Sequence, residues 1–385
     1  MTRLDERQLH QVLGREEHEL LTSWDRERFA GARVLITGAG GSVGGALARV
    51  VARCAPESLT LFDHSEYALF RIEQDLQREA PGAPIIPLLG DICRPRSLRQ
   101  AFERSFPDVV YHAAAYKHVT MTERAVAPAI ETNVFGTLNV ARVAREYGAR
   151  LVLISSDKAA QPASVMGATK RFAEMAVMAE ESADFRPVAV RFGNILGSSG
   201  SLVEVVLDAI REGRPIPLTD PHATRYFMTA REAVSLVMKA DLLGLGGEIY
   251  WLDMGEPVRI LDVIDRLREL AMGQGLRPVP VQVVGLRPGE KQREELTTQG
   301  LELGPTPHRR IWKARQSTLD RARVKRILRA LRMDLRRGDV LAALQDLAAG
   351  VPGYTPSRQA WQQAAGVSVE PLARPMTPEP RTLVA

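Results

Sequence analysis

A glycine-rich turn between a strand and a helix is the feature that most constrains the fold of this chain. The apolar run RVLIT (33–37) leads into TGAGGSVG, which opens a helical stretch over 42–52. Glycines spaced as G-x-x-G-x-x-G at such a junction allow a tight turn, close backbone approach to a pyrophosphate and close packing of helix on strand. The free N–H groups at the helix start favour phosphate. The residues expected to contact a dinucleotide from this turn are Gly38, Gly41, Ser42, Val43 and Gly44.

Short apolar runs and helical stretches alternate along most of the chain after this turn. This pattern predicts an α/β fold, a doubly wound parallel Rossmann-type sheet, with a smaller C-terminal substrate-binding lobe over the carboxyl ends of the strands. The expected strands cover 33–37, 59–64, 85–88, 109–115, 150–156 and 188–194, and the expected helices cover 42–52, 66–78, 96–105, 125–147 and 165–181. In the smaller lobe we expect helices over 202–211, 230–243 and 260–272 and strands over 248–252 and 279–284.

A chain of 385 residues is long enough to form two packed units. We expect an N-terminal helical extension over 1–30 and a Rossmann domain over 31–193. A ligand-binding lobe that includes a basic helix should cover 194–354. Residues 355–385 are rich in proline and lack periodicity, so we expect a partly mobile tail there.

Composition excludes several classes of protein. Apolar residues make up 45% of the chain and charged residues 25%, as in globular proteins and unlike disordered chains or coiled-coil rods. Two cysteines, Cys54 and Cys93, are too few for a disulfide framework or a four-ligand zinc site, which favours a reducing compartment. No apolar run approaches the roughly 20 residues that span a bilayer, and the charged N-terminus is no signal peptide. We therefore expect a cytoplasmic protein without a membrane span.

The basic excess of the chain is local. The formal net charge is +5, but His308 to Arg337 alone holds twelve Lys or Arg against two Asp. Apolar residues recur at helical spacing within this stretch, which predicts an amphipathic helix with a solvated cationic face. A nucleic-acid interface is the less favoured interpretation, because no nucleic-acid motif or interleaved aromatic residue accompanies the charge.

Acidic residues after the next two strands extend the predicted dinucleotide site. Asp63 follows the turn by about 20 residues, where a carboxylate suits ribose hydroxyls and repels a 2′-phosphate, so NAD is favoured over NADP. Asp91 and Ile92 follow the third strand and are expected at the adenine, although a helix N-cap is an equal alternative for Asp91. Ala113 and Ala114 end the fourth strand and are small enough to let the nicotinamide approach.

An acid and an amine stand side by side where the fifth strand ends, in Ser156-Asp157-Lys158. Lys170 follows in the next helix and should converge on the same edge of the sheet. A lysine near Lys170 and a cationic nicotinamide should have a lowered pKa, which suits Lys158 as a base. Burial could raise the pKa of Asp157 enough for it to act as an acid. The alternative is a surface salt bridge between these neighbours.

Ten segments of the chain together resemble one enzyme family. The segments are ITGAGGSVG, LFDHSEY, AAAYKHV, TNVFGT, ISSDKAA, VMGATKR, RFGNILGSSGS, TDPHATRYFMT, EIYWLDMGEPVRI and GLRPGEK, spread between about residues 10 and 355. They are similar to the UDP-N-acetylglucosamine 4,6-dehydratases of polysaccharide biosynthesis, which are extended short-chain dehydrogenase/reductases. Long members of the family carry an N-terminal membrane region, which this sequence does not show. We therefore expect a soluble version of the catalytic part.

The resemblance implies a redox-neutral reaction with tightly bound NAD that is regenerated in each cycle. Hydride leaves C4, water is lost across C5–C6 with Lys158 as base and Asp157 as acid, and hydride returns to C6. Met166 stands where most short-chain dehydrogenases have their tyrosine base. The long branch of the family is similar in having methionine there. The base for the 4-hydroxyl is therefore Ser156, Asp157 or a water, while Lys170 would hold the nicotinamide ribose.

The resemblance also implies a sugar-nucleotide site in the lobe over 194–354, with a UDP-sugar as substrate. Guanidinium groups suit its two phosphates. The residues expected to line this site are Lys117, His118, Asn194, Ser201, Arg225, Arg287 and Glu290. The histidines are not spaced as a metal site, so we expect no metal.

Other functions remain open at this stage. A 4-epimerase or a 5,6-dehydratase shares the fold and cofactor, although an epimerase needs no acid at C6. A non-catalytic NAD- or nucleotide-sugar-binding regulator is a further alternative, because Met166 replaces the usual base. By analogy with other short-chain dehydrogenases, we expect at least a homodimer paired through the helices over 125–147 and 165–181.

Overall fold

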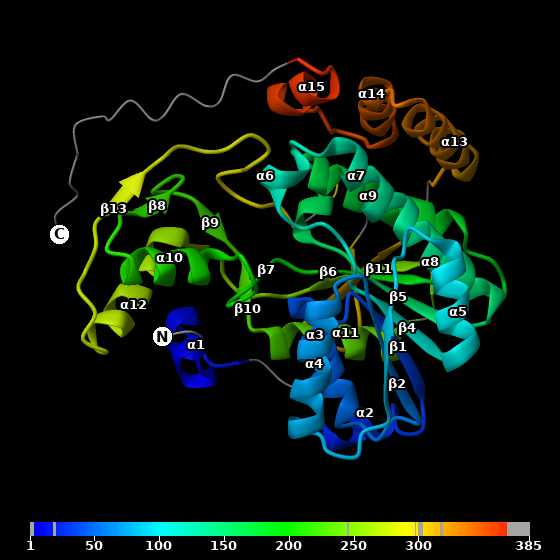
Figure 1. The fold of residues 1–385 in the computed structure, drawn as a ribbon, viewed down its shortest axis with the longest axis horizontal. Helices are drawn as coiled ribbons and strands as arrows, with labels where there is room; N and C mark the ends of the chain where they lie inside the picture. The colour runs from blue at the N-terminus through cyan, green and yellow to red at the C-terminus, as the bar shows by residue number, and fades with distance from the viewer. Residues whose placement is uncertain are drawn as a thin grey trace.

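A nine-stranded sheet forms the centre of the molecule in a computed structural model, which describes residues 4–17, 21–244, 246–296, 298, 303–315 and 319–367 (Figure 1). The strand order is β14-β15-β11-β6-β5-β4-β1-β2-β3, in which β3 to β11 are parallel and β15 and β14 run antiparallel. The predicted doubly wound parallel sheet is confirmed. Its strands are β1 (Arg33–Thr37), β2 (Ser58–Asp63), β3 (Ile85–Leu89), β4 (Val109–His112), β5 (Arg150–Ile154), β6 (Val188–Arg191), β11 (Glu248–Leu252), β14 (Leu303–Pro305) and β15 (Ile311–Arg315).

Helices cover both faces of the sheet, because its inner strands are apolar on both sides. One core joins the sheet to α3, α4 and α11, and a second joins the opposite face to α5, α8 and α9. The bounds of these helices are α3 (Ser42–Ala52), α4 (Glu66–Glu79), α5 (Pro95–Ser105), α8 (Thr137–Glu146), α9 (Val165–Ala179) and α11 (Ala230–Leu243). The predicted bounds of α3 and α11 match these.

The helix predicted over 125–147 is confirmed as one continuous helical stretch, but it contains a π-helical turn that was not predicted. Its parts are α7 (Val126–Ile130), the π-helical turn over Glu131–Gly136 and α8. Buried Asn133 lies in this turn and holds both backbone groups of Tyr116, at 2.8 and 3.1 Å. A π-helical turn re-aims one side chain without ending the helix, and such turns are frequent at functional sites.

A smaller lobe packs on its own apolar core beside the sheet. Its main helices are α1 (Glu6–Leu13), α10 (Leu202–Arg211) and α12 (Ile260–Met272). Because α1 packs on α12, the predicted 1–30 extension is not a separate unit. Short strand pairs complete the lobe and its junction with the sheet: β7 (Asn194–Ile195) with β10 (Phe227–Met228), β8 (Ile216–Leu218) with β13 (Val281–Val283), and β9 (Thr224–Arg225) with β12 (Val258–Arg259). The remaining short helices are α2 (Ser23–Glu27) and α6 (Val119–Thr122).

The sheet does not end at the predicted boundary near residue 194. Strand β11 pairs with β6 in parallel, and β15 pairs with β11, so segments beyond 194 extend the Rossmann sheet. Side-chain pattern alone gives no sign of which sheet a short strand joins, because pairing depends on tertiary contacts.

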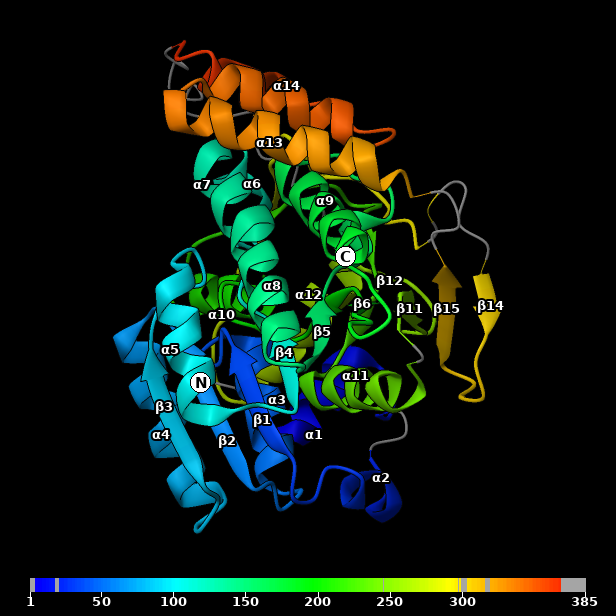
Figure 2. The same ribbon diagram turned by 90° about the vertical axis from the view of Figure 1, so that its right-hand side faces the viewer.

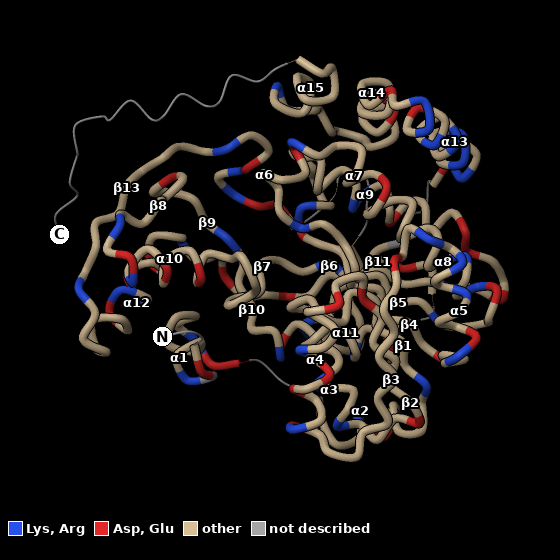
Figure 3. Tube along the Cα trace, in the orientation of Figure 1, with Lys and Arg blue, Asp and Glu red and all other residues tan. Residues whose placement is uncertain are grey.

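Three C-terminal helices form a further layer; sequence assigned the first two to the 194–354 lobe and the third to the tail. They are α13 (Arg321–Arg337), α14 (Val340–Gly350) and α15 (Arg358–Ala364). Figure 2 shows α13 and α14 lying over α7, α8 and α9. The predicted amphipathic helix is confirmed, because Val324, Leu328 and Leu331 are buried while most of its Lys and Arg are exposed. Figure 3 marks these basic positions in blue along α13.

This layer covers the helix through which a dimer was predicted. All fifteen residues of α9 are buried within the chain, several of them against α13 and α14. Because every residue of α9 is buried in the single chain, this helix has no exposed face for a second copy; the predicted homodimer stays a prediction. The tail predicted over 355–385 begins with the ordered helix α15, and residues 368–385 lie outside the described part.

Within the described residues, no helix combines the length and apolar character needed to cross a bilayer.

Candidate functional site

A cavity of about 1070 Å³ lies between the carboxyl ends of the sheet strands and the smaller lobe. Its walls run from the glycine-rich turn, past Lys158 and Lys170, to Arg287 and Glu290. The space exceeds what one small ligand needs, since typical ligand pockets measure about 300–1,000 Å³. It therefore suits two ligands end to end.

The glycine-rich turn forms a narrow cradle at one end of this cavity. Gly38 has φ +69°, which favours glycine, and leads towards α3, whose N-terminus has no side-chain cap. A Cβ at Gly44 would lie 2.1 Å from the Gly38 carbonyl oxygen, so helix and turn are in close contact. The backbone N–H groups at the start of α3 lack partners within the helix and are suited to bind an anion.

Replacing Gly44 with alanine should loosen this cradle. The new methyl group would clash with backbone atoms of Gly38 and Ala39, which cannot rotate away. We expect at least a tenfold loss of dinucleotide affinity and a fall of about 1–3 kcal/mol in the free energy of unfolding. Titration with NAD and urea unfolding measure both. Gly45→Ala is the matched control, because its methyl group would meet atoms no closer than 3.3 Å; equal losses in both variants would contradict the cradle.

The acids predicted to contact a dinucleotide lie on neighbouring strands. Asp63 is buried and accepts hydrogen bonds from the N–H groups of Gly40 (2.9 Å) and Ser65 (2.9 Å), so its carboxylate is fixed beside the turn. Asp91 accepts from the N–H of Cys93 (2.8 Å). The helix N-cap considered as its alternative is wrong, because Arg94 is the N-cap residue of α5. Its neighbour Ile92 is 5% exposed.

Lys170 reaches the cavity from α9. It is 8% exposed and donates to the carbonyl of Ile154 at 2.8 Å. Burial lowers the pKa of Lys170 to about 8, although Glu174 opposes the shift.

The structure places the predicted neighbour Ala113 in the cavity wall and Ala114 against Gly38. Burial and Lys170 lower the pKa of His112 to about 3, so this histidine is neutral between two threonine hydroxyls.

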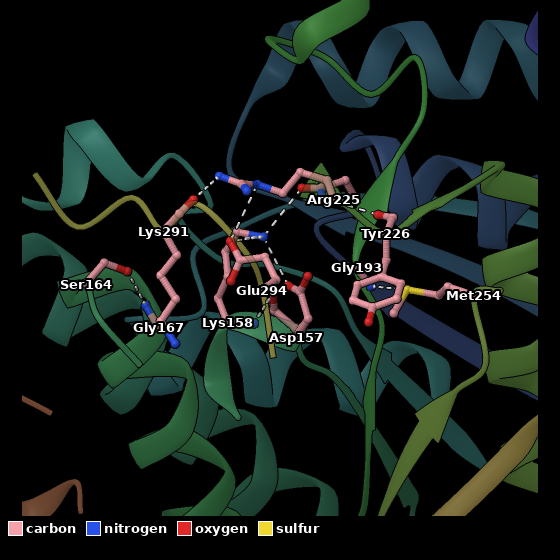
Figure 4. A network of polar contacts seen from close by, with 12 residues as sticks. Asp157, Lys158, Ser164, Gly167, Gly193, Arg225, Tyr226, Met254, Lys291 and Glu294 are labelled. Atoms are coloured by element: carbon pink, nitrogen blue, oxygen red, sulfur yellow. Dashed lines mark hydrogen bonds and ion pairs between the residues drawn. The ribbon is translucent and has the colours of Figure 1, made fainter. Parts of the chain in front are cut away.

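Ser156, Asp157 and Lys158 form one polar cluster just beyond β5. Figure 4 shows Asp157 and Lys158 side by side in it. The Ser156 hydroxyl donates to Asp157 Oδ1 at 2.9 Å, and Lys158 Nζ lies 3.0 Å from the same oxygen. The side chain of Asp157 is 1% exposed and that of Lys158 is 18% exposed. The neighbours are thus a buried acid and amine at the cavity, unlike a surface salt bridge.

Asp157 itself lies just behind the wall of the cavity. Among the described residues, Ser156, Lys158 and Gly193 line the cavity and Asp157 does not. Asp157 Oδ2 is buried without a hydrogen-bond partner, and a Cβ at Gly193 would lie 3.2 Å from it. The absence of a side chain at 193 thus lets the backbone pack closely against this oxygen.

Glu294 and Arg225 complete the cluster. The sequence pattern predicted no role for Glu294 and a phosphate contact for Arg225. Glu294, which was missed, has Oε1 3.5 Å from Lys158 Nζ and 3.6 Å from Arg225 Nε. Burial alone would lower the pKa of Lys158, but the carboxylates of Asp157 and Glu294 outweigh burial and raise it. The predicted lowering of the Lys158 pKa is wrong; the lowered pKa belongs to Lys170.

Arg225 is held by the chain rather than left open for phosphate. Its guanidinium donates to the carbonyls of Lys291 (2.7 Å), Gln292 (3.1 Å) and Thr224 (2.7 Å). The predicted phosphate contact would use the donor capacity that remains. In this structure Arg225 anchors the 291–294 segment to β9.

The other predicted substrate residues surround the far part of the cavity. Asn194 Oδ1 lies 3.4 Å from Lys158 Nζ, and Ser201 Oγ is buried without a partner at the start of α10. Lys117 donates to the carbonyl of Ser199 at 2.6 Å. Arg287 and Glu290 share a turn in which the Glu290 carboxylate accepts from the Arg287 N–H. The structure brings all predicted substrate residues to the cavity wall: Lys117, His118, Asn194, Ser201, Arg225, Arg287 and Glu290.

A buried ion cluster contacts Ser155, the residue that follows β5. Glu174 is fully buried and accepts from Ser155 Oγ (2.6 Å), Arg191 Nε (2.7 Å) and Arg171 (3.1 Å). Arg191 is also fully buried and stacks over Trp251. The sequence gave no sign of this cluster, because its members come from one helix and two strands.

Met166 lines the cavity and is 4% exposed. Sequence reasoning missed several apolar and hydroxyl-bearing wall residues, because apolar and hydroxyl side chains at these positions carry no distinctive chemical signal: Met121, Thr122, Ala125, Pro128, Val205, Pro217, Thr219 and Ile260. No group of three or more His, Cys, Asp or Glu in the described residues could hold a metal.

A parallel Rossmann-type sheet with this cavity at its carboxyl edge defines an extended short-chain dehydrogenase/reductase. The model of the family described as "Polysaccharide biosynthesis protein" matches residues 34–316, and the chain belongs to this family. The predicted family is confirmed.

Curated relatives agree with the family match. The chain is 39% identical over 293 residues to the capsular polysaccharide biosynthesis protein CapD of Staphylococcus aureus, covering 75% of this chain and 49% of CapD. It is 43% identical over 289 residues to the probable polysaccharide biosynthesis protein EpsC of Bacillus subtilis, covering 74% and 48%. The chain therefore spans about half the length of these relatives. Among solved structures, Pen from Bacillus thuringiensis superposes with a TM-score of 0.69 at 30% identity, covering 75% of this chain and 89% of Pen.

Proposed function

We propose that this protein is an NAD-dependent nucleotide-sugar 4,6-dehydratase acting on UDP-N-acetylglucosamine or a close UDP-sugar. One observation carries the proposal: a buried acid and an amine, Asp157 and Lys158, meet at 3.0 Å against the cavity that begins at the glycine-rich turn. An elimination needs an acid and a base, and both belong beside the reacting sugar. A 4-epimerase needs no acid at C6.

The residues at the turn fit a dinucleotide. The glycines of the 38–44 turn let its backbone pack closely without side chains at those positions, and the uncapped start of α3 would supply N–H donors to a pyrophosphate. Asp63 would accept from a ribose hydroxyl and repel a 2′-phosphate, which favours NAD over NADP. Lys170 would hold the nicotinamide ribose. When bound, the nicotinamide would take a hydride from C4 and later return it to C6.

The cluster can account for each proton in the reaction. Ser156 lines the cavity and can pass the 4-hydroxyl proton to Asp157, since Met166 carries no exchangeable proton. Lys158, once neutral, would take the C5 proton. Asp157 would give its proton to the C6 hydroxyl, which leaves as water when the C6–O bond breaks. The C5 proton then returns from Lys158 as C6 is reduced, so the product is a 4-keto-6-deoxy sugar.

The other half of the cavity would hold the nucleotide diphosphate. Ser201 Oγ has no partner and lies at the N-terminus of α10, where backbone donors attract phosphate. Arg287 would add a guanidinium, and Glu290 would accept from the uridine ribose. Asn194 lies between this part and Lys158.

Mass spectrometry tests the proposal directly. Purified protein loaded with NAD is incubated with UDP-N-acetylglucosamine, and we expect a product lighter by one water with no net consumption of NAD. A product isomeric with the substrate would instead indicate a 4-epimerase. Binding of NAD and substrate without any product would indicate a regulator and reject the proposed chemistry.

A further inference from the structure

We propose that Glu294 is a positioning residue, whose carboxylate holds Lys158 and Arg225 in one cluster and so fixes the Lys158 amine at the cavity wall. The inference rests on the proposed role of Lys158 as a base. Glu294 Oε1 lies 3.5 Å from Lys158 Nζ and 3.6 Å from Arg225 Nε, and its side chain is 6% exposed (Figure 4). A carboxylate this buried needs such cations as partners.

The charges around Lys158 balance only when Glu294 is counted. Among the described residues, the carboxylates paired with the amine are those of Asp157 and Glu294, and Arg225 is the cation that shares Glu294. The fourth neighbour, Asn194, is neutral and contributes its amide oxygen at 3.4 Å. Two negative and two positive groups thus form a buried cluster without net charge. Without Glu294 the cluster would hold an excess positive charge.

Glu294 also joins the base to the segment expected to bind the nucleotide. Arg225 donates to the carbonyls of Lys291 and Gln292, which fixes the segment three residues before Glu294. Arg287 and Glu290 lie just upstream on the same segment and line the cavity. Docking of this segment therefore brings the nucleotide wall and the counter-ion of Lys158 into place together.

The consequence is a pH dependence with a definite direction. Lys158 must be neutral to accept a proton, and an adjacent carboxylate favours its charged form. Removing the charge of Glu294 should lower the pKa of Lys158 and increase its neutral fraction at a given pH. We expect the acidic limb of the pH profile of kcat to move down by about one unit in Glu294→Gln. The plateau value of kcat should fall several-fold, because the amine is less firmly held.

The test compares Glu294→Gln with Glu295→Gln in the full chain. Glu295 is the adjacent glutamate, its side chain is 47% exposed and it pairs with Lys291. An amine-specific acylating reagent is applied across a pH series, and mass spectrometry measures the modification of Lys158 without any turnover. We expect Lys158 in Glu294→Gln to be modified about tenfold faster below the midpoint, as a one-unit shift requires. Glu295→Gln should match the wild type.

Each outcome bears on the inference. A lower labelling midpoint confined to Glu294→Gln supports it, even if the wild type proves inactive on UDP-sugars, which would reject only the proposed function. An unchanged midpoint, or the same shift in Glu295→Gln, overturns it. If Glu294→Gln fails to fold, Glu294→Asp serves in its place, because it keeps the carboxylate but moves it away from Lys158. A Lys158 labelling midpoint identical to that of the wild type, together with an unchanged pH profile of kcat, would then reject a positioning role.

Discussion

Replacing Lys158 with methionine should abolish dehydration while leaving the fold and cofactor site intact. Methionine keeps a similar length but has no group that accepts a proton, so removal of the C5 proton loses its base. General acid–base catalysis contributes about 10²- to 10⁴-fold, and we expect a loss of kcat in that range. In deuterated water the wild type should incorporate deuterium at C5, and the variant should not.

The step affected can be separated from hydride removal at C4. Rapid mixing with substrate should still show transient reduction of NAD in Lys158→Met, because that step needs no proton on C5. Lys325→Met is the control, since Lys325 lies on the exposed face of α13. Deuterium at C5 in Lys158→Met at the wild-type rate would show that another group removes this proton.

Replacing Glu174 with glutamine should produce the largest loss of stability. Glu174 is fully buried between Arg191 and Arg171, and the variant would leave two buried guanidinium groups without a counter-ion. Breaking a buried ion pair from one side costs about 3–5 kcal/mol in the free energy of unfolding. Urea unfolding measures this loss. Glu146→Gln removes a surface partner of Arg99 and should cost at most about 1 kcal/mol.

The stability loss expected in Glu174→Gln depends on pH in a predictable direction. Burial alone would raise the pKa of Glu174, but Arg191 and Arg171 outweigh burial and lower it. A carboxyl with a lowered folded pKa stabilises fully above its unfolded pKa of about 4.3, and the contribution fades as pH falls through the folded value. The stability difference between wild type and Glu174→Gln should therefore shrink in acid. A difference that is constant with pH would show that the variant acts through packing alone.

The local parts of the fold followed from sequence because they depend on short-range patterns. The glycine spacing and the apolar runs predicted the first βαβ unit, and helices α3, α10, α11 and α12 have the predicted bounds. Periodicity did not reveal the π-helical turn over Glu131–Gly136, in which Asn133 pairs with the backbone of Tyr116, because apolar spacing carries no record of such contacts. The place of α13 over α9 was also hidden, since an apolar stripe predicts burial but not the surface that buries it.

The chain alone determined which chemical groups are available at this site: glycines for a phosphate cradle, Asp63 for a ribose, and Ser156, Asp157 and Lys158 for proton transfer. Tertiary structure decided their chemical state. Burial opposes the charge of Lys158, but Asp157 and then Glu294, which only folding brings to this amine, raise its pKa; burial lowers the pKa of Lys170. Folding also covered α9 with α13 and α14, closing the surface expected to pair two copies. Charge interaction and burial depend on distances between residues remote in the chain, and those distances exist only once the chain has folded.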